Sequence, residues 1–399
     1  MRIAFVYPGY WPYIRRGVER LMHDLASYLV DHGHWVDIIT SKPGHGRTGH
    51  DNRLTVRYLP WYQHPLTQAY LPMWRYYLFG LASMQVLARE QYDLLHVWTY
   101  SYAFGATILR HVRRTPYLFH QIVDDPFFPN GLHRWCYERI LVGANQVAAL
   151  TQYGADVLRA RHGIHAAVLP PPVDTRVFQP RATRDLQRPR VLFPGDLGDE
   201  RKGGLLLLRA WNEVHRRCPQ AMLQLAGPFG FAWNPAARMF LATIPSVVTD
   251  PAARAAIEIL GEGAVADLPT MYANAAVTVL PSVHEAFGMV ITESLASGTP
   301  VVCSDSAGPG QIIGGDFSIG RTIALRDTPD LFSSRLVMPL AEAILEAIDL
   351  ARVPTTIERC RGRAAQWDLQ HVGAQAEALY SAMLRSSMAG TESTGEIVG

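Results

Sequence analysis

The sequence is poor in cysteine and in charge. Its 399 residues include four cysteines, and these form no C-x-x-C pair and no zinc-type spacing. Neither a disulfide framework nor a cysteine zinc site is therefore expected, and the thiols should be reduced and structural. Charged residues make up 18% of the chain and the formal net charge is +2, which argues against nucleic acid as a partner.

Long apolar runs are also missing. No uninterrupted run reaches about 18 apolar residues, and the opening run Arg2–Tyr7 turns at Pro8-Gly9, too early for a secretory signal. The expectation is a cytoplasmic protein that does not span a membrane. Residues 61–85 are rich in Trp, Tyr, Leu and Met, so peripheral contact with the inner membrane face is an alternative there. The favoured interpretation of this segment is a packed helix.

Short apolar strands alternate with amphipathic helices along the whole chain, the pattern of parallel α/β sheets. Apolar residues make up 48%, enough for a large core, and the length suggests two or three domains. Strands are predicted at Ile3–Tyr7, Trp35–Thr40, Leu94–Val97, Tyr117–His120, Gln146–Leu150, Ala167–Leu169, Val191–Phe193, Met222–Ala226, Ile257–Leu260, Val277–Leu280 and Val301–Cys303. The main predicted helices cover Val18–Leu29, Gly204–Arg217, Leu268–Ala273, Ala341–Ala351 and Trp367–Leu384.

The stretch Pro281–Val302 carries the strongest functional signal. It places Glu285 and Glu293 eight positions apart with Gly288 between them. A helix that begins near Gly288 would direct its free N–H groups and positive dipole end at an anion. The two carboxylates on either side would accept hydrogen bonds from hydroxyl groups. This combination of groups suits a nucleoside-diphosphate sugar.

A second candidate phosphate site is the glycine-rich turn Gly195–Gly204, which follows a predicted strand and opens a helix. Lys202 would act there as a point charge for a diphosphate. The spacing is not that of a Walker A loop. No G-x-G-x-x-G follows the first strand, so NAD and FAD are not expected.

The Pro281–Val302 stretch closely resembles the E-x7-E segment of retaining glycosyltransferases with the GT-B fold, in particular glycosyltransferase family 4. The resemblance implies an α/β protein with two Rossmann-like domains that face a cleft, and a C-terminal helix that crosses back to the first domain. The implied domains are an acceptor-side domain (1–178), a nucleotide-sugar domain (179–365), the returning helix (366–385) and a disordered tail (386–399). Pro170-Pro-Pro172 would form the semi-rigid hinge between the first two.

The resemblance also assigns roles to residues in both predicted domains. It gives Glu285 the donor sugar, Glu293 the ribose hydroxyls and Lys202 the diphosphate, and it makes His120 a strand-end histidine close to the reacting sugar. We take His120, Lys202 and Glu285 as the catalytic candidates. The candidates for donor binding are Gly17, Arg201, Lys202, Phe287, Gly288, Met289 and Glu293. His96, at another strand end, is expected to pack.

One departure from the family pattern concerns the diphosphate. The family has a phosphate-gripping Arg where this chain has Asp196. Replacing a cation by an anion about 4 Å from a phosphate shifts the pair energy by several kcal/mol even at an effective dielectric near 20. Either Arg201 or Arg16 compensates, with a pair to Asp196 as the favoured arrangement, or the donor sits differently, or donor binding is weak.

The predicted function is a metal-independent retaining glycosyltransferase that moves a sugar from a nucleoside-diphosphate sugar to an acceptor hydroxyl. No cofactor is expected beyond this co-substrate. Two alternatives stay open: a GT-B nucleotide-sugar epimerase, and a catalytically silent GT-B binding subunit. Asp196 and Gln311, where the family often has Glu, keep the second alternative in view. The sequence leaves the acceptor, the base and sugar of the donor, and the oligomeric state open.

Overall fold

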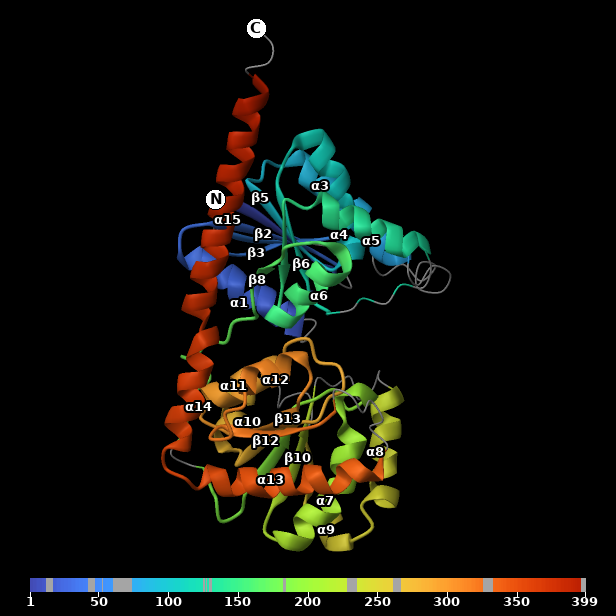
Figure 1. The fold of residues 1–399 in the computed structure, drawn as a ribbon, viewed down its shortest axis with the longest axis vertical. Helices are drawn as coiled ribbons and strands as arrows, with labels where there is room; N and C mark the ends of the chain where they lie inside the picture. Colours follow the sequence, from blue (N-terminus) through green and yellow to red (C-terminus); the bar gives the residue numbers. More distant parts are fainter. Residues whose placement is uncertain are drawn as a thin grey trace. The chain divides into compact units, whose positions relative to one another are not determined.

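The computed structural model describes residues 1–11, 17–41, 47–51, 53–59, 74–124, 126, 128, 131–181, 184–227, 235–260, 267–325 and 333–395. Contacts within the chain divide it into two units (Figure 1). The N-terminal unit consists of Met1–Pro172 together with Leu369–Gly399, and the C-terminal unit is Val173–Asp368. Each is an α/β unit built on its own sheet.

The boundary between the units falls within the proline-rich segment, earlier than residue 178. The N–H of Val173 donates to the carbonyl of Trp367 at 2.8 Å, and Val173 bridges to Asp368. Phe178 is 1% exposed and packs against Tyr272. These contacts attach residues 173–178 to the C-terminal unit.

The sheet of the N-terminal unit is parallel except at one edge. Its order over the described residues is β3-β4-β2-β1-β5-β6-β7-β8, and only the edge pair β3–β4 among these strands is antiparallel. The strands are β1 (Arg2–Val6), β2 (Trp35–Thr40), β3 (Arg47–Asp51), β4 (Leu54–Tyr58), β5 (Leu94–Trp98), β6 (Tyr117–Gln121), β7 (Gln146–Ala149) and β8 (Ala167–Val168). The order changes direction between β1 and β5, as in doubly wound folds.

Helices cover both faces of this sheet. They are α1 (Gly17–Asp31), α3 (Trp74–Arg89), α4 (Tyr100–Arg113), α5 (Gly131–Gly143), α6 (Gln152–His162) and α15 (Leu369–Gly395). Apolar residues of α3, α4 and α5 form one core with alternate residues of β5 and β6, such as Val97 and Phe119. On the other face, α15, drawn in red in Figure 1, packs along α1 and reaches β5 through Tyr380.

The C-terminal unit contains a parallel sheet of order β11-β10-β9-β12-β13-β14. Its strands are β9 (Arg190–Phe193), β10 (Met222–Ala226), β11 (Ile257–Leu260), β12 (Val277–Leu280), β13 (Val301–Ser304) and β14 (Gly320–Ile323). The chain winds outward in one direction from β9 and in the other from β12. The strand order therefore reverses between β9 and β12, the position at which ligands bind in open α/β sheets.

The helices of this unit are α7 (Gly204–Arg217), α8 (Pro235–Val247), α9 (Pro251–Ala255), α10 (Leu268–Asn274), α11 (Met289–Ala296), α12 (Ala307–Ile313), α13 (Val337–Ala351) and α14 (Thr356–Ala364). Short 3-10 turns are η2 (Glu200–Lys202), η4 (Ser334–Leu336) and η5 (Ala365–Trp367). Trp211 on α7 and Ile344 on α13 are fully buried in one core with the sheet. Predicted helix α7 has the expected bounds, because its apolar positions recur at helical spacing.

One sequence expectation, the disordered tail, differs from the structure. Helix α15 continues to Gly395, so the segment from Ser386 is helical where a disordered tail was expected; once a helix is nucleated, each further residue costs little, and no proline interrupts it. Residues 396–399 lie outside the described part. Of the segment 61–85, residues 74–85 belong to α3, whose Tyr77 and Phe79 are buried in the core, and residues 61–73 lie outside the described part.

The four cysteines are buried and free. Burial raises the pKa of the Cys303 and Cys360 thiols, which keeps them protonated and unreactive. Within the described part of the chain, no helix has both the length and the apolar character needed to cross a membrane.

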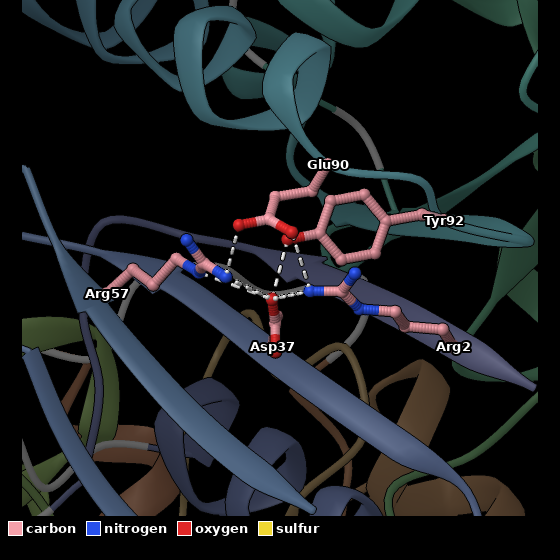
Figure 2. A network of polar contacts seen from close by, with 5 residues as sticks. All are labelled: Arg2, Asp37, Arg57, Glu90 and Tyr92. Carbon is pink, nitrogen blue, oxygen red and sulfur yellow. Dashed lines mark hydrogen bonds and ion pairs between the residues drawn. The ribbon is translucent and has the colours of Figure 1, made fainter.

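A network of charged side chains joins four segments of the N-terminal unit on the sheet face covered by α3 (Figure 2). Asp37 Oδ2 accepts hydrogen bonds from the Tyr92 hydroxyl at 2.7 Å and from the guanidinium groups of Arg2 and Arg57 at 3.2 and 3.0 Å. Glu90 binds the same two guanidinium groups at 2.9 and 2.8 Å. Two cations therefore balance two anions, and the Arg2 hydrogen bond lowers the pKa of Glu90.

Asp37→Ala should destabilise the N-terminal unit by about 3 kcal/mol, because it leaves two guanidinium groups and a phenol facing a buried void. The Asp37 side chain is only 6% exposed, so water does not replace it. Urea unfolding followed by tryptophan fluorescence measures the change. Glu213→Gln, which breaks an exposed pair with Arg216, is the control and should shift stability by less than about 0.5 kcal/mol. Equal effects of the two substitutions would contradict the structural importance of the network.

Candidate functional site

The strongest cluster of predicted site residues lies at the carboxyl ends of β9 and β12. These two strands are neighbours in the C-terminal sheet, and the strand order reverses between them. The loop after β9 leads into η2 and α7, and the loop after β12 leads into α11. Because parallel neighbours end at the same edge of a sheet, the two loops meet although they are far apart in sequence.

An ion pair joins the two loops. Lys202 Nζ lies 2.6 Å from Glu285 Oε2, and the two residues are 83 positions apart in the chain. Their side chains are 26% and 17% exposed, so the pair is partly desolvated yet reachable from solvent. The structure thus brings together two of the three predicted catalytic residues.

A glycine is required where the loops touch. Gly203 has φ 75°, in the left-handed region that other residues rarely adopt. A Cβ atom at this position would lie 2.2 Å from the carbonyl oxygen of Pro281. The N–H of Val283 also donates to the carbonyl of Arg201 at 2.9 Å. These contacts fix the Lys202 backbone against the loop that carries Glu285.

Helix α11 begins immediately after this loop. Gly288 is its N-cap with φ 97°, as predicted from the position of the glycine. The first N–H groups of a helix have no intrahelical acceptor, so this end offers donors and a positive dipole. The N–H of Gly308, on α12, donates to the Glu285 carbonyl at 3.3 Å, which holds the loop from a second side.

The other predicted residues of this loop and helix have different surroundings. Glu293 is 5% exposed on α11. Phe287 is 4% exposed and makes an edge-to-face contact with Trp367, so it anchors the loop to η5. Met289 is half-buried in the first turn of α11, where its carbonyl accepts from the Thr292 hydroxyl at 2.9 Å.

The structure gives Arg201 a different partner from the expected one. Its guanidinium binds the Asp199 carboxylate through two hydrogen bonds of 3.0 and 2.7 Å, and this contact, with burial opposing it, lowers the pKa of Asp199. Asp196 Oδ1 instead accepts from the N–H of Gly198 at 2.9 Å. The expected Asp196–Arg201 pair is therefore wrong. Arg16, the other proposed partner, lies outside the described residues.

Arg184 supports the site and was not singled out by the sequence analysis. Its guanidinium donates to the carbonyls of Ala273, Ser297 and Gly298 at 3.1, 3.2 and 3.0 Å, and to the Thr299 hydroxyl at 2.6 Å. It thus binds carbonyl groups at the C-terminal ends of α10 and α11, where a cation is favourable. No local pattern reveals this, because its partners lie 89 to 115 residues away.

The remaining predicted residues belong to the N-terminal unit. His120 lies near the carboxyl end of β6 and is 1% exposed, and burial lowers its pKa to about 3. His96 on β5 is fully buried, and burial lowers its pKa well below the usual range. Gly17 is the first residue of α1 and is exposed. Both histidines are therefore neutral at pH 7.

Two family profiles match the two units. The family described as glycosyltransferase family 4 matches residues 15–177, and the family described as glycosyl transferases group 1 matches residues 188–348. The chain is a GT-B glycosyltransferase of the family 4 type. The GT-B fold expected from the sequence is confirmed.

Sequence relatives agree with this family, and solved structures agree with its fold. A segment of 205 residues is 32% identical to D-inositol 3-phosphate glycosyltransferase of Paenarthrobacter aurescens, covering 48% of this chain and 47% of the relative. The match with this chain thus spans about half the length of that curated relative. Sucrose-phosphate synthase from Thermosynechococcus elongatus matches with a TM-score of 0.80 and 21% identity, over 96% of this chain and 99% of that one. Anabaena HepE, solved in complex with UDP and glucose, matches with a TM-score of 0.69 and 18% identity, over 96% and 100%.

Among the residues that the structure describes, no group of three or more His, Cys, Asp or Glu side chains is arranged to hold a metal ion. The charged groups found at the candidate site are instead the Lys202 ammonium and the carboxylates of Glu285 and Glu293.

The stability of the glycosyltransferase should fall as the pH drops below about 6.5. The pKa values of His96 and His120 are lowered in the folded state, so below pH 6.5 the unfolded chain binds protons that the folded chain does not. Each histidine should cost about 1.4 kcal/mol per pH unit in this range. Urea unfolding at pH 7, 6 and 5 tests this: His120→Gln should flatten the pH dependence. His371→Gln, at an exposed position of α15, should leave the pH dependence unchanged. Equal slopes for all three proteins would contradict the lowered pKa values of the buried histidines.

Proposed function

We propose that the protein transfers a sugar from a nucleoside-diphosphate sugar to an acceptor hydroxyl, with retention of the anomeric configuration. The observation that carries this proposal is the Lys202–Glu285 pair of 2.6 Å beside the start of α11. A cation, a helix N-terminus and a carboxylate stand together there. These are the groups that a diphosphate and a sugar hydroxyl require.

Lys202 is assigned to the departing diphosphate. An ammonium group has three N–H donors, so Lys202 can keep its hydrogen bond to Glu285 and still donate to phosphate oxygens. Charge on the leaving group grows in the transition state, and a fixed cation with helix N–H groups stabilises that charge. The proposal therefore needs no divalent metal at the diphosphate.

Glu285 and Glu293 are assigned to the hydroxyl groups of the donor. Glu285 lies at the N-terminal side of α11 and would accept from the sugar, while Glu293, one turn further into the helix and buried, would accept from the ribose. A buried carboxylate that binds two ribose hydroxyls discriminates against nucleotides that lack them, because water in so enclosed a place does not replace the lost hydrogen bonds. The structure of HepE in complex with UDP and glucose supports a nucleotide-sugar donor.

A thermal-shift panel of UDP-, GDP-, ADP- and TDP-sugars in the presence of EDTA tests the proposal. One of them, at 100 times its dissociation constant, should stabilise the protein by about 2.7 kcal/mol, and added magnesium should not increase the shift. Glu293→Ala should weaken the same nucleotide by roughly 1–3 kcal/mol. The absence of a shift with every donor would favour a silent binding subunit, and conversion of the donor into another nucleotide sugar without any acceptor would favour an epimerase.

Lys202→Met should reduce nucleotide release at least about tenfold, because the leaving diphosphate loses its cation. Arg217→Met is the matched control: it removes a cation that pairs with Glu342 at the far end of α7, about 20 Å along the helix. The control should retain full turnover. Any stability that Lys202→Met loses because Glu285 is left without its cation should return in the double variant Lys202→Met/Glu285→Gln. Turnover should not return. Full turnover of Lys202→Met, or its loss only through unfolding, would contradict the assigned role.

A further inference from the structure

A buried chain of hydrogen bonds connects helix α15 to the end of strand β6 in the N-terminal unit. The Tyr380 hydroxyl lies 2.7 Å from His96 Nδ1, and His96 Nε2 lies 3.1 Å from His120 Nδ1. All three side chains are at most 1% exposed. Trp98 stacks on the His96 ring at a centroid distance of 3.8 Å, so the ring cannot turn freely.

Both histidines are neutral, since burial lowers the pKa of each. A neutral imidazole has one N–H donor and one bare nitrogen that accepts. The tautomer of each ring is therefore set by what its two nitrogens face. Along a chain of three groups only two directions of donation are consistent.

In the first direction the Tyr380 hydroxyl donates to His96 Nδ1, and His96 Nε2–H donates to His120 Nδ1. The proton of His120 then sits on Nε2. In the reverse direction His120 donates to His96, and His96 donates to the oxygen of Tyr380. That arrangement leaves the Tyr380 hydroxyl hydrogen without an acceptor among the described residues, as well as leaving His120 Nε2 a bare acceptor.

The first direction leaves one buried polar atom unpaired, and the reverse leaves two. No described residue makes a hydrogen bond with His120 Nε2. Because unpaired buried polar groups are costly, the chain is directed from Tyr380 toward His120.

The surroundings of His120 also mark a functional strand end. Thr99 directly follows β5, its N–H lies 3.4 Å from the His120 carbonyl, and it has φ 70°. A β-branched residue in this conformation is strained, and such strain gathers at functional sites. The strand order of this sheet reverses between β1 and β5, beside this position.

We propose that Tyr380 and His96 are positioning residues that hold His120 as the Nε2–H tautomer, so that His120 donates a hydrogen bond to an oxygen of the transferred sugar. The tautomer follows from the contacts alone, and its use on the sugar rests on the proposed function. His120 Nε2 is buried and has no hydrogen-bond partner among the described residues, which leaves its donor for a ligand oxygen. A helix at the C-terminus thereby sets the hydrogen-bonding state of a candidate catalytic residue.

The tautomer can be measured directly by NMR of protein labelled with ¹⁵N at histidine. In the wild type His120 should show a protonated Nε2 and a bare Nδ1, with the signals assigned by their loss in His120→Gln. Tyr380→Phe should remove the fixed tautomer of His96 and leave a mixture at His120. Tyr28→Phe is the matched control, because it removes another buried hydroxyl that binds α15, at Glu377, without contacting His96.

Calorimetry links the tautomer to sugar binding. With UDP-glucose and UDP as probes, or the best pair from the thermal-shift panel, Tyr380→Phe and His96→Phe should weaken the nucleotide sugar about three- to tenfold, the loss of one neutral hydrogen bond. The affinity for the bare nucleotide should not change. His96→Gln, which can accept from Tyr380 and donate to His120, should restore part of the difference; a merely structural defect would weaken both probes and would not be rescued.

The outcomes separate this inference from the proposed function. A wild-type His120 protonated on Nδ1, or an unchanged tautomer in Tyr380→Phe, would overturn the positioning role whatever the protein binds. A confirmed tautomer with equal affinities for nucleotide sugar and nucleotide in every variant would overturn the sugar contact. Failure of all donors to bind would refute the proposed function and leave the tautomer result standing.

Discussion

The candidate donor site depends on the close approach of two loops at the carboxyl ends of β9 and β12. Gly203 lies so near the Pro281 carbonyl that a side chain there would collide with it. This contact brings Lys202 and Glu285, 83 positions apart, to within 2.6 Å. Gly288 then starts α11 with its free N–H groups directly after the second loop. A larger residue at position 203 would push the two loops apart and so break the Lys202–Glu285 pair, although no charged group is changed.

The two units use different electrostatics. In the C-terminal unit, Lys202 and Glu285 lie at half-buried positions, where they stay partly hydrated and can exchange partners with a ligand. The N-terminal unit buries His96 and His120 completely and keeps them neutral, so they can supply only the fixed hydrogen bonds of neutral rings. The first kind of group can exchange its ionic partner for a charged ligand, whereas the second can only offer a hydrogen bond of fixed direction.

The sequence predicted those elements whose physics is local. Strands such as Val277–Leu280 were predicted from short apolar runs, which arise because both faces are buried. The start of α11 was predicted near Gly288, where the structure has a positive φ that favours glycine. The edge strand β3 (Arg47–Asp51) was missed, since a polar edge strand has no such pattern. Arg184 was missed because each of its partners is remote. The pairing of Arg201 was mispredicted because a contact two residues away, with Asp199, is closer than the one inferred from the family pattern.

At Asp196 the loop accommodates a charge opposite to that of the family pattern. Where the family pattern has a cation, this chain has an anion, yet its Oδ1 accepts from the N–H of Gly198 within the same turn. Such local hydrogen bonding satisfies part of the carboxylate and fixes its direction. The neighbouring Asp199 meanwhile holds Arg201, whose side chain is 65% exposed, beside Lys202. The loop Gly195–Gly204 carries two cations against three carboxylates, and Arg201 is held by Asp199. In the proposed donor site, Lys202, whose partner Glu285 lies on the other loop, is therefore the cation that can exchange its partner for a phosphate.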